Sequence, residues 1–453
     1  MKDIGIVICN FNKKEYILNC VQSVLNAKGD NYDVFVVDNA STDGSAEALA
    51  EQFGHKITLL VNEENLGGAG GFDTGLEEVL KRDYKYYMLM DNDILVDENA
   101  IVSLYDFLED EKHKDVGMVG SKVYFMDEPD VIWGYGGKID FKDYVQKDQF
   151  KNMKDSDAIP ETFYCDYVAA CSLMVRADVV KKVGIMPKEN FIYWDDMEWG
   201  YRFNEAGYKV CVYGKSKIWH KAGGRNAGNT FIHYYMWRNR IRFFLKVLKP
   251  EQREHFADTI LTEMFRMIYS VNLKDETNII KTLMYAFDDA VHGVTGKAKE
   301  GRILNRPQVP NRVEMACAGK KSMLIRYNGH MEGLGNVIQN IRKFAPDMKI
   351  GVSCDKCPET ATLLMEQYPN CEVTTEYKPG HYDGHFIMCD HIFKLAATDE
   401  TDSYIDPWCN VIYSEDDFVY AKSFAQTRDL FVMCKKILLL DNAVIIKHPF
   451  DRE

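Results

Sequence analysis

The 453-residue sequence lacks long hydrophobic runs, a signal peptide and an excess of positive charge. No stretch approaches the roughly 20 apolar residues that are needed to cross a bilayer. The N-terminus leads directly into a strand-like apolar run, without the apolar core and cleavage site of a secretion signal. The formal net charge of −14 argues against general nucleic-acid binding, which depends on clustered Lys and Arg. We therefore expect a cytoplasmic protein that binds no nucleic acid.

A disulfide framework is also missing. The 12 cysteines are scattered from Cys9 to Cys434, several of them within apolar runs, which is typical of reduced thiols. Cys354 and Cys357 form a CxxC pair, but no second pair lies at zinc-finger spacing. The cysteines therefore predict neither a structural zinc site nor a redox pair.

Strand-like and helix-like segments alternate in the first 95 residues. The predicted strands are 4–9, 34–37, 57–61 and 86–90, and the predicted helices are 16–26, 46–53 and 75–81. This alternation predicts an α/β fold in which a mostly parallel sheet carries helices on both faces. Such sheets bind their ligands at the carboxyl ends of the strands.

The chain is too long for one core, and its character changes along its length. Residues 1–230 hold the alternating pattern, and residues 231–300 are aromatic and basic with helical spacing. A stretch rich in Gly, Lys, Arg and Pro between 293 and 310 resembles a linker. Residues 311–453 return to alternating strands and helices, so they predict a second, smaller α/β domain of unknown role.

Polar residues follow the predicted strands. Asp91 and Asp93 are separated by one residue, so both can reach a single hard cation and the oxygens of a diphosphate. Asp38 is placed to accept hydrogen bonds from the base or ribose of a nucleotide. An isolated Asp-Asn-Asp triplet is more often a turn, and only its position after a strand favours a ligand role. The predicted donor-binding residues are Asn10, Asn12, Asp38, Asn39, Asn65, Gly67, Gly68 and Asp91.

Three of these residues, Asn65, Gly67 and Gly68, belong to a glycine-rich segment at positions 65–71. We interpret it as a loop whose backbone can approach a sugar or phosphate closely. It lacks the lysine and serine of a phosphate-binding P-loop, so the sequence disfavours a nucleotide hydrolase.

Several acids and tryptophans crowd the segment 194–199, just before a predicted helix. Such a setting can tune the pKa of a carboxylate, and Asp196 is the candidate general base. A helix N-terminus also favours acids through its dipole alone. Aromatic rings suit sugar faces, and we predict that the acceptor contacts Trp133, Trp194 and Trp199. His220 follows another strand and is suited to bind a metal or a diphosphate.

The order of these motifs over residues 1 to about 245 resembles glycosyltransferase family 2, whose members have the GT-A fold. Within that family the sequence is similar to the bacterial rhamnosyltransferase and galactofuranosyltransferase branch. The likeness is carried by the glycine-rich segment 65–71, the acidic cluster 194–199 and the run 234–239. The segment 286–293 resembles the usual end of that module, so residues 1–230 are expected to be the catalytic domain and 231–300 its helical extension.

The resemblance implies specific partners for the strand-end residues. Asp38 is expected to contact the nucleotide of a UDP- or dTDP-sugar, whereas Asp91, Asp93 and His220 hold Mn²⁺ or Mg²⁺ with the diphosphate. The acceptor is implied to be a hydroxyl of a bacterial cell-surface polysaccharide or lipid-linked glycan.

The resemblance also implies a mechanism. Asp196 is the general base of a direct displacement that inverts the anomeric configuration, and Asp195 and Glu198 help to place the acceptor. Two positions depart from the branch: Asn92 stands where another Asp is common, and the strand 168–172 lacks a usual glycine. Both weaken any choice of sugar.

Other interpretations stay open. A nucleotidyltransferase also needs a parallel sheet, a metal and paired acids, although basic residues would be expected where Asn10-Phe11-Asn12 stands. A non-catalytic glycan-binding scaffold is a further alternative. The basic aromatic segment 234–246 fits either the inner face of the cell membrane or an ordinary packed helix. The predicted second domain holds a group of acids and histidines that fits either a metal site or an ordinary solvated surface. These residues are His381, Asp383, His385, Asp390 and His391. Homo-oligomerisation is also left open.

Overall fold

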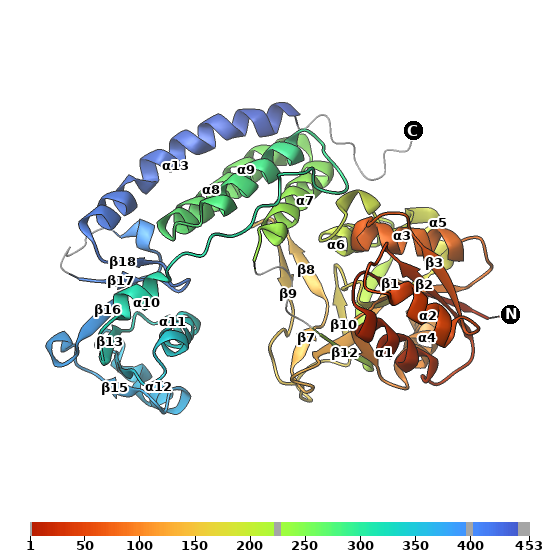
Figure 1. The fold of residues 1–453 in the computed structure, drawn as a ribbon, viewed down its shortest axis with the longest axis horizontal. Helices are drawn as coiled ribbons and strands as arrows, with labels where there is room; N and C mark the ends of the chain where they lie inside the picture. Colours follow the sequence, from red (N-terminus) through yellow and green to blue (C-terminus); the bar gives the residue numbers. More distant parts are fainter. Residues whose placement is uncertain (1, 222–227, 396–401, 443–453) are drawn as a thin grey trace. The chain divides into compact units, whose positions relative to one another are not determined.

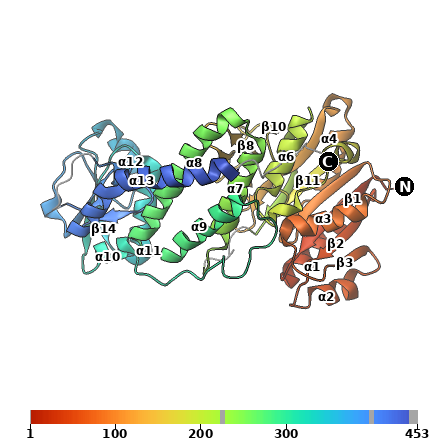
Figure 2. The same cartoon turned by 90° about the horizontal axis from the view of Figure 1, so that it is seen from above.

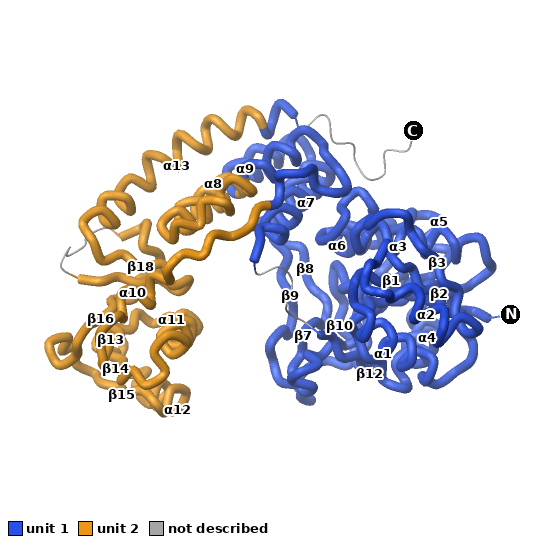
Figure 3. The backbone as a smooth tube through the Cα atoms, viewed as in Figure 1, with its two compact units in different colours: residues 1–259, 284–303, 439–453 blue, residues 260–283, 304–438 orange. Residues whose placement is uncertain are grey.

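The computed structural model describes residues 2–221, 228–395 and 402–442 (Figure 1). The chain forms two compact units, of which the first holds residues 1–259, 284–303 and 439–453 and the second residues 260–283 and 304–438 (Figure 3). Three of the four divisions fall within helices, namely α8 (Pro250–Leu273), α9 (Thr277–Val291) and α13 (Glu415–Asn442), and the fourth lies between residues 303 and 304, outside any helix. The functional limits expected near residues 230 and 310 stay predictions. Within the described residues, no helix is both long and apolar enough to span a bilayer.

The first unit begins with the predicted alternation of strands and helices. Its first elements are β1 (Ile4–Asn10), α1 (Lys14–Leu25), β2 (Tyr32–Asp38), α2 (Ser45–Phe53), β3 (Ile57–Val61), α3 (Gly67–Val79) and β4 (Tyr86–Asp91). Strands β1 to β4 pair in parallel. The carboxyl ends of these strands therefore lie at one edge of the sheet, as predicted.

The remaining elements include strands that extend the sheet, some of them antiparallel. They are β5 (Ile94–Val96), α4 (Ala100–Glu109), β6 (Val116–Phe125), β7 (Ile132–Gly134), β8 (Gly137–Asp140), β9 (Val145–Asp148), β10 (Thr162–Cys165), β11 (Ser172–Arg176), α5 (Ala177–Val183), α6 (Asp195–Glu205), β12 (Lys209–His220) and α7 (Phe231–Val247). The strand order is β10-β12-β6-β11-β4-β1-β2-β3, with β10 and β11 antiparallel to their neighbours, whereas β8 and β9 form a separate two-stranded sheet. The mostly parallel sheet is confirmed.

Alternating side chains of β1 reach two separate cores. Ile6 and Ile8 pack with helices α1, α2 and α4 on one face of the sheet, whereas Val7 packs with α3, α5 and α6 on the other. Since successive side chains of a strand point to opposite faces, a strand covered on both sides needs an unbroken apolar run. This requirement explains the β-branched sequence of β1 and β2.

The glycine-rich segment differs from its predicted loop, because helix α3 already begins at Gly67 instead of near Gly75. In both views α3 lies over β1 (Figures 1 and 2). A Cβ at Gly71 would overlap the Cys9 sulfur, and one at Gly75 would overlap the Val7 side chain. These glycines therefore allow close packing of the helix on the sheet.

The second unit contains the smaller α/β fold expected from the sequence, whereas the predicted bounds 311–453 stay a prediction. Its elements are α10 (Arg312–Cys317), β13 (Ser322–Arg326), α11 (Met331–Phe344), β14 (Lys349–Ser353), α12 (Ala361–Gln367), β15 (Glu372–Thr374), β16 (Gly384–Met388), β17 (Tyr404–Ile405) and β18 (Val411–Ile412), followed by α13. The strand order is β15-β14-β13-β16-β17-β18, and only the β17–β18 pair is antiparallel. Leu334, Val337 and Ile341 form the buried stripe of α11, at the spacing that a helix requires.

Candidate active site

Two carboxylates and one imidazole meet at the carboxyl end of β4. Asp91 is the last residue of β4, Asp93 follows two residues later, and His220 ends β12, which pairs with the neighbouring β5. Nε2 of His220 lies 3.1 Å from Oδ1 of Asp93 and 3.7 Å from Oδ2 of Asp91. One ligand atom from each of the three residues can be chosen so that all lie within 4.8 Å of one another. Two residues separated by one position in the sequence and a third more than 120 residues away are thus brought together.

This group has the polar atoms that a divalent cation needs. Among the described residues, Oδ1 of Asp93 and both ring nitrogens of His220 are buried and lack a well-aligned hydrogen bond, although Nε2 and Oδ1 lie 3.1 Å apart. Burial alone would raise the pKa of Asp93, but His220 and the paired Lys13 ammonium outweigh it and hold the pKa well below its usual range. Because Asp93 is ionised and the imidazole is available, the donor set fits Mn²⁺ or Mg²⁺.

Asparagine side chains connect the strand ends beneath this group. Nδ2 of Asn10 donates to Oδ2 of Asp38 at 2.9 Å, and Nδ2 of Asn92 donates to Oδ1 of Asn10 at 2.7 Å. The other Asp38 oxygen accepts from the Ser41 backbone amide at 2.8 Å. The middle residue of the acidic triplet, Asn92, therefore joins β4 to β1.

The remaining predicted donor residues build the loops around α3 and α1. Nδ2 of Asn39 donates to Oδ1 of Asn65 at 3.1 Å and to the carbonyl of Gly67 at 2.8 Å. Oδ1 of Asn12 accepts from the Thr42 backbone amide at 2.7 Å. Gly67 has a φ of +78°, and a Cβ there would overlap the carbonyl of Phe191. These residues shape the strand-end loops.

A cavity of about 340 Å³ within the first unit joins the metal group to the acids of α6. Its lining includes Asp91 and His220 as well as Asp195 and Asp196. Of the other predicted site residues, Gly68 and Trp133 line it, whereas Asn10, Asn12, Asp38, Asn39, Asn65, Gly67, Asp93, Trp194, Glu198 and Trp199 do not. Two of the three predicted metal ligands, Asp91 and His220, thus share one cavity with the predicted base Asp196.

Asp196 stands out electrostatically in this cavity. Burial, the neighbouring Asp195 and the nearby Asp148 raise its pKa to about 8, although the backbone amides of Met197 and Ala170 lower it in part. A carboxylate with a pKa near the operating pH is suited to general base catalysis.

Comparisons with known proteins agree with this geometry. The family description Glycosyl transferase family 2 matches residues 5–178. This segment is a glycosyltransferase family 2 domain. The match favours a glycosyltransferase over the nucleotidyltransferase alternative and confirms the family resemblance.

Galactofuranosyltransferase GlfT2 of Mycolicibacterium smegmatis is 26% identical over 215 residues, which cover 44% of this chain and 32% of that protein. An uncharacterized glycosyltransferase of Haemophilus influenzae is 20% identical over 312 residues, covering 63% of this chain and 92% of the relative. A solved structure of GalNAc-T7 with UDP, GalNAc and Mn²⁺ has a TM-score of 0.45 and 13% identity, and covers 57% of this chain and 50% of that one. The chain spans about a third of the length of the mycobacterial relative.

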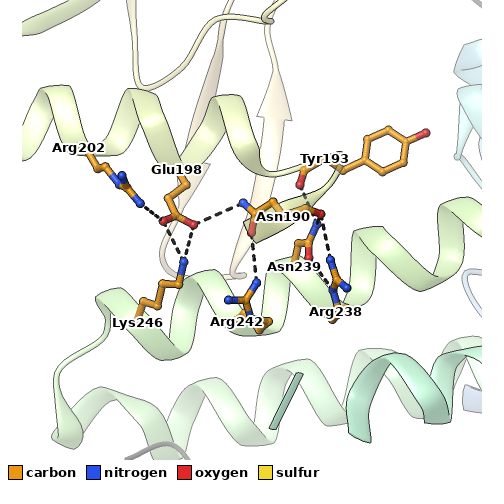
Figure 4. A network of polar contacts seen from close by, with 8 residues as sticks. All are labelled: Asn190, Tyr193, Glu198, Arg202, Arg238, Asn239, Arg242 and Lys246. Atoms are coloured by element: carbon orange, nitrogen blue, oxygen red, sulfur yellow. Dashed lines mark hydrogen bonds and ion pairs between the residues drawn. The ribbon is translucent and has the colours of Figure 1, made fainter. Parts of the chain in front are cut away.

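Glu198 lies outside the cavity that Asp91 and Asp196 line. Its carboxylate is 1% exposed and contacts Nη2 of Arg202 at 2.6 Å and Nζ of Lys246 at 2.9 Å (Figure 4). Burial raises its pKa, but the charges of Lys246 and Arg202 outweigh this effect and lower the pKa to about 2. Both oxygens are therefore engaged in a contact between α6 and α7, and this position does not suit the predicted role of placing the acceptor.

Two of the three predicted acceptor tryptophans are likewise core residues. Trp194 is fully buried against Phe243 and Phe244, and Nε1 of Trp199 donates to the carbonyl of Gly184 at 2.9 Å. Trp133, in contrast, lines the cavity with its ring edge-to-face to that of His220 at 4.5 Å. Of the three, only Trp133 can meet a ligand in this cavity.

Sequence reasoning missed a part of the cavity wall near Asp196. Asp148 at the end of β9 lines the cavity together with Lys151 and Tyr167, whose hydroxyl donates to Asp148 at 2.8 Å. The Lys151 ammonium lies 5.7 Å from the centre of the Trp133 ring. These residues come from short antiparallel strands and turns, in which no periodic pattern marked them.

Two alternatives left open by the sequence are decided by the contacts. Arg238, Arg240 and Arg242 are all buried, so α7 is a packed helix in which the arginines bind within the unit. In the described part of the chain, Asp91, Asp93 and His220 are the one group with ligand atoms close enough for a metal. In the second unit, His385 instead contacts Asp402 at 2.8 Å, and Asp390 accepts from Asn328 at 2.9 Å.

Proposed function

We propose that the protein is an inverting, metal-dependent glycosyltransferase that moves a sugar from a UDP- or dTDP-sugar to a hydroxyl of a cell-surface polysaccharide or lipid-linked glycan. The observation that supports it most is the single cavity lined by Asp91, His220, Asp195 and Asp196. A donor diphosphate and an acceptor hydroxyl can meet there within reach of a metal group and a base.

In the proposed reaction, Asp196 takes the proton of the acceptor hydroxyl. The acceptor oxygen forms the new bond to the anomeric carbon while the bond from that carbon to the diphosphate breaks, and the leaving diphosphate keeps the electron pair. Asp91, Asp93 and His220 hold a divalent cation, Mn²⁺ or Mg²⁺, which when bound supplies Lewis-acid stabilisation of the leaving group. A single displacement inverts the configuration and needs one base and no nucleophilic side chain.

The donor is proposed from the similarity to GlfT2 and to the rhamnosyl and galactofuranosyl branch. Galactofuranose, rhamnose or another hexose fits this proposal. The acceptor side is proposed to include Trp133, whose ring can stack on a sugar face.

A donor screen tests the proposal. The purified chain is incubated with UDP-galactofuranose, dTDP-rhamnose or common UDP-hexoses, with and without a lipid-linked acceptor, in MnCl₂ or in a chelator. We expect release of UDP or dTDP from at least one donor, lost in the chelator. His220→Ala should lower this release by at least about 10-fold, whereas the control His292→Ala, an exposed histidine outside the cavity, should leave it unchanged. Release no greater than the metal-free blank for every donor would refute the assignment.

A further inference from the structure

The backbone just before the cavity acids is held in a left-handed conformation. Phe191, Tyr193 and Trp194 have φ values of 66°, 64° and 65°, although none of them is glycine. A residue with a side chain is strained in this conformation, which persists only where its surroundings fix it. Asp195 and Asp196 follow directly, so the direction in which their side chains leave the backbone depends on this segment.

One side chain of α7 contacts most of that segment. Nδ2 of Asn239 donates to the carbonyls of Asn190 and Tyr193 at 2.8 and 2.9 Å (Figure 4). It also donates to the carbonyl of Ile192 at 2.8 Å. An amide nitrogen carries two hydrogens, so the three carbonyl oxygens share them. Asn239 is 1% exposed, and water does not compete for these contacts.

Arg238 sets the orientation of this amide. Nε of Arg238 donates to Oδ1 of Asn239 at 2.9 Å, so the oxygen faces the guanidinium and the nitrogen faces the three carbonyls. The same guanidinium donates to the carbonyls of Asn190 at 2.9 Å and Gly296 at 2.7 Å. The adjacent pair Arg238 and Asn239 therefore acts as one clamp on the segment 190–193.

The segment is held from other directions as well. The Ala69 backbone amide at the start of α3 donates to the carbonyl of Phe191 at 3.1 Å. The ring of Tyr235 on α7 stacks on that of Phe191 at 4.9 Å. Met236 of α7 lines the cavity itself. The segment therefore connects the start of α3, beside Gly68, to Asp195 and Asp196 at the start of α6.

We propose that Asn239 is a positioning residue for the catalytic carboxylate: its amide fixes the left-handed segment 191–194 so that Asp195 and Asp196 enter the cavity, and Arg238 orients that amide. The inference rests on the proposed function for the role of Asp196, but the contacts with the three carbonyls are independent of any reaction. Asn239 therefore affects catalysis through the position of Asp196 and does not itself touch the substrate.

Asn239→Asp is the sharpest test, because it keeps the shape of the side chain and replaces the donor by a carboxylate that faces three carbonyls. We expect turnover to fall at least about 30-fold, while binding of UDP in MnCl₂, measured by calorimetry, changes less than about 3-fold. Hydrogen exchange of residues 190–197 should become faster. The acidic limb of the turnover–pH profile should move to lower pH, because Asp196 would leave its position beside Asp195, Asp148 and Tyr167, in a cavity also lined by Asp91, His220 and Lys151.

Asn204→Asp is the matched control. Asn204 lies on α6, is exposed, and also donates to two backbone carbonyls, those of Asp166 and Gly200. We expect it to leave turnover, pH profile and exchange at 190–197 unchanged. If Asn239→Asp does not fold, Asn239→Ser removes the contacts without adding charge and is measured in its place.

The outcomes separate this inference from the function. If the folded variant keeps the wild-type pH profile and exchange at 190–197 while only its melting temperature falls, Asn239 is merely structural and the inference is overturned. If the wild type transfers no sugar, the proposed function fails, yet faster exchange at 190–197 in the variant still supports the clamp.

Discussion

Two neighbouring acids on opposite faces of α6 have pKa values that are shifted in opposite directions. Asp196 lines the cavity and its pKa rises to about 8, whereas Glu198, two residues later, pairs with Arg202 and Lys246 and its pKa falls to about 2. Both are removed from water to a large degree. The difference comes from their partners, because Asp196 meets other acids and Glu198 meets two cations.

Acids that lie close together in a sequence can therefore have two different functions. A carboxylate held among other carboxylates costs stability and gains a pKa useful for proton transfer. A carboxylate paired with buried cations loses its basicity and fixes two helices instead. Substitutions on each face of α6 should therefore change different observables.

The largest effect is expected for Asp196→Asn. Turnover should fall at least about 100-fold, because the base is lost, while binding of UDP in MnCl₂ stays within about 3-fold. The folded pKa is raised from 3.8 to about 8, so ionisation of the wild-type carboxyl destabilises the fold progressively as the pH rises from about 4 to 8. The Asn variant should melt higher than the wild type at pH 8, with the gap closing toward pH 4.

Asp178→Asn, an exposed acid in the first turn of α5, is the control for this variant and should leave both quantities unchanged. Turnover of Asp196→Asn within about 3-fold of the wild type would instead favour a non-catalytic scaffold.

Glu198→Gln should change stability much more than chemistry. Removing one charge leaves the buried Lys246 and Arg202 uncompensated, which costs about 3–5 kcal/mol. The melting temperature should fall by roughly 6–20 °C at neutral pH. Turnover per folded molecule should stay within a few-fold, because Glu198 does not line the cavity.

The pH dependence gives the sign of this effect. The folded pKa of Glu198 is lowered from 4.5 to about 2, so its stabilisation is complete above about 4.5 and is lost as the pH falls toward 2. The stability gap between wild type and Glu198→Gln should shrink in that window, as followed by thermal melts. Glu98→Gln, which removes an exposed ion pair with Lys28, should cost less than about 1 kcal/mol. Equal melting temperatures for wild type and Glu198→Gln at pH 7 would contradict the pairing.

The strand ends could be predicted from the sequence because a parallel α/β sheet places them at one edge. This rule found Asp38, Asp91 and Asp93 in the first unit, and also His220 at the end of a distant strand, and the resemblance implied that Asp91, Asp93 and His220 hold one metal. The two faces of α6 follow from helical geometry: positions two apart differ by about 200° around the axis, so Asp196 and Glu198 face opposite sides.

Other features depend on contacts that no local pattern contains. The glycines at 71 and 75 suit a loop in the sequence, yet their role is to let α3 approach Cys9 and Val7. From the sequence alone, the arginines of α7 also fit a membrane surface. The structure shows instead that Arg238, Arg240 and Arg242 are buried. In the sequence, Asn239 is marked only as the last residue of the run 234–239, which carries part of the family resemblance. Its contacts could not be predicted, because the carbonyls that it binds lie 46–49 residues earlier in the chain.

The smallest effect concerns the tryptophans that the sequence grouped together. Trp133 lines the cavity and Trp199 lies in the core, so Trp133→Phe should change ligand binding and Trp199→Phe should change stability. A smaller ring at position 133 loses about 0.5–1.5 kcal/mol of stacking, which corresponds to a rise of roughly 2- to 13-fold in the KM for the acceptor that supports transfer. The melting temperature of Trp133→Phe should stay within about 2 °C of the wild type, whereas Trp199→Phe loses its hydrogen bond to Gly184 and should melt lower by roughly 2–6 °C with an unchanged KM. If Trp133→Phe instead lowers the melting temperature and leaves the KM alone, its ring supports His220 by packing and the acceptor binds elsewhere on the cavity wall.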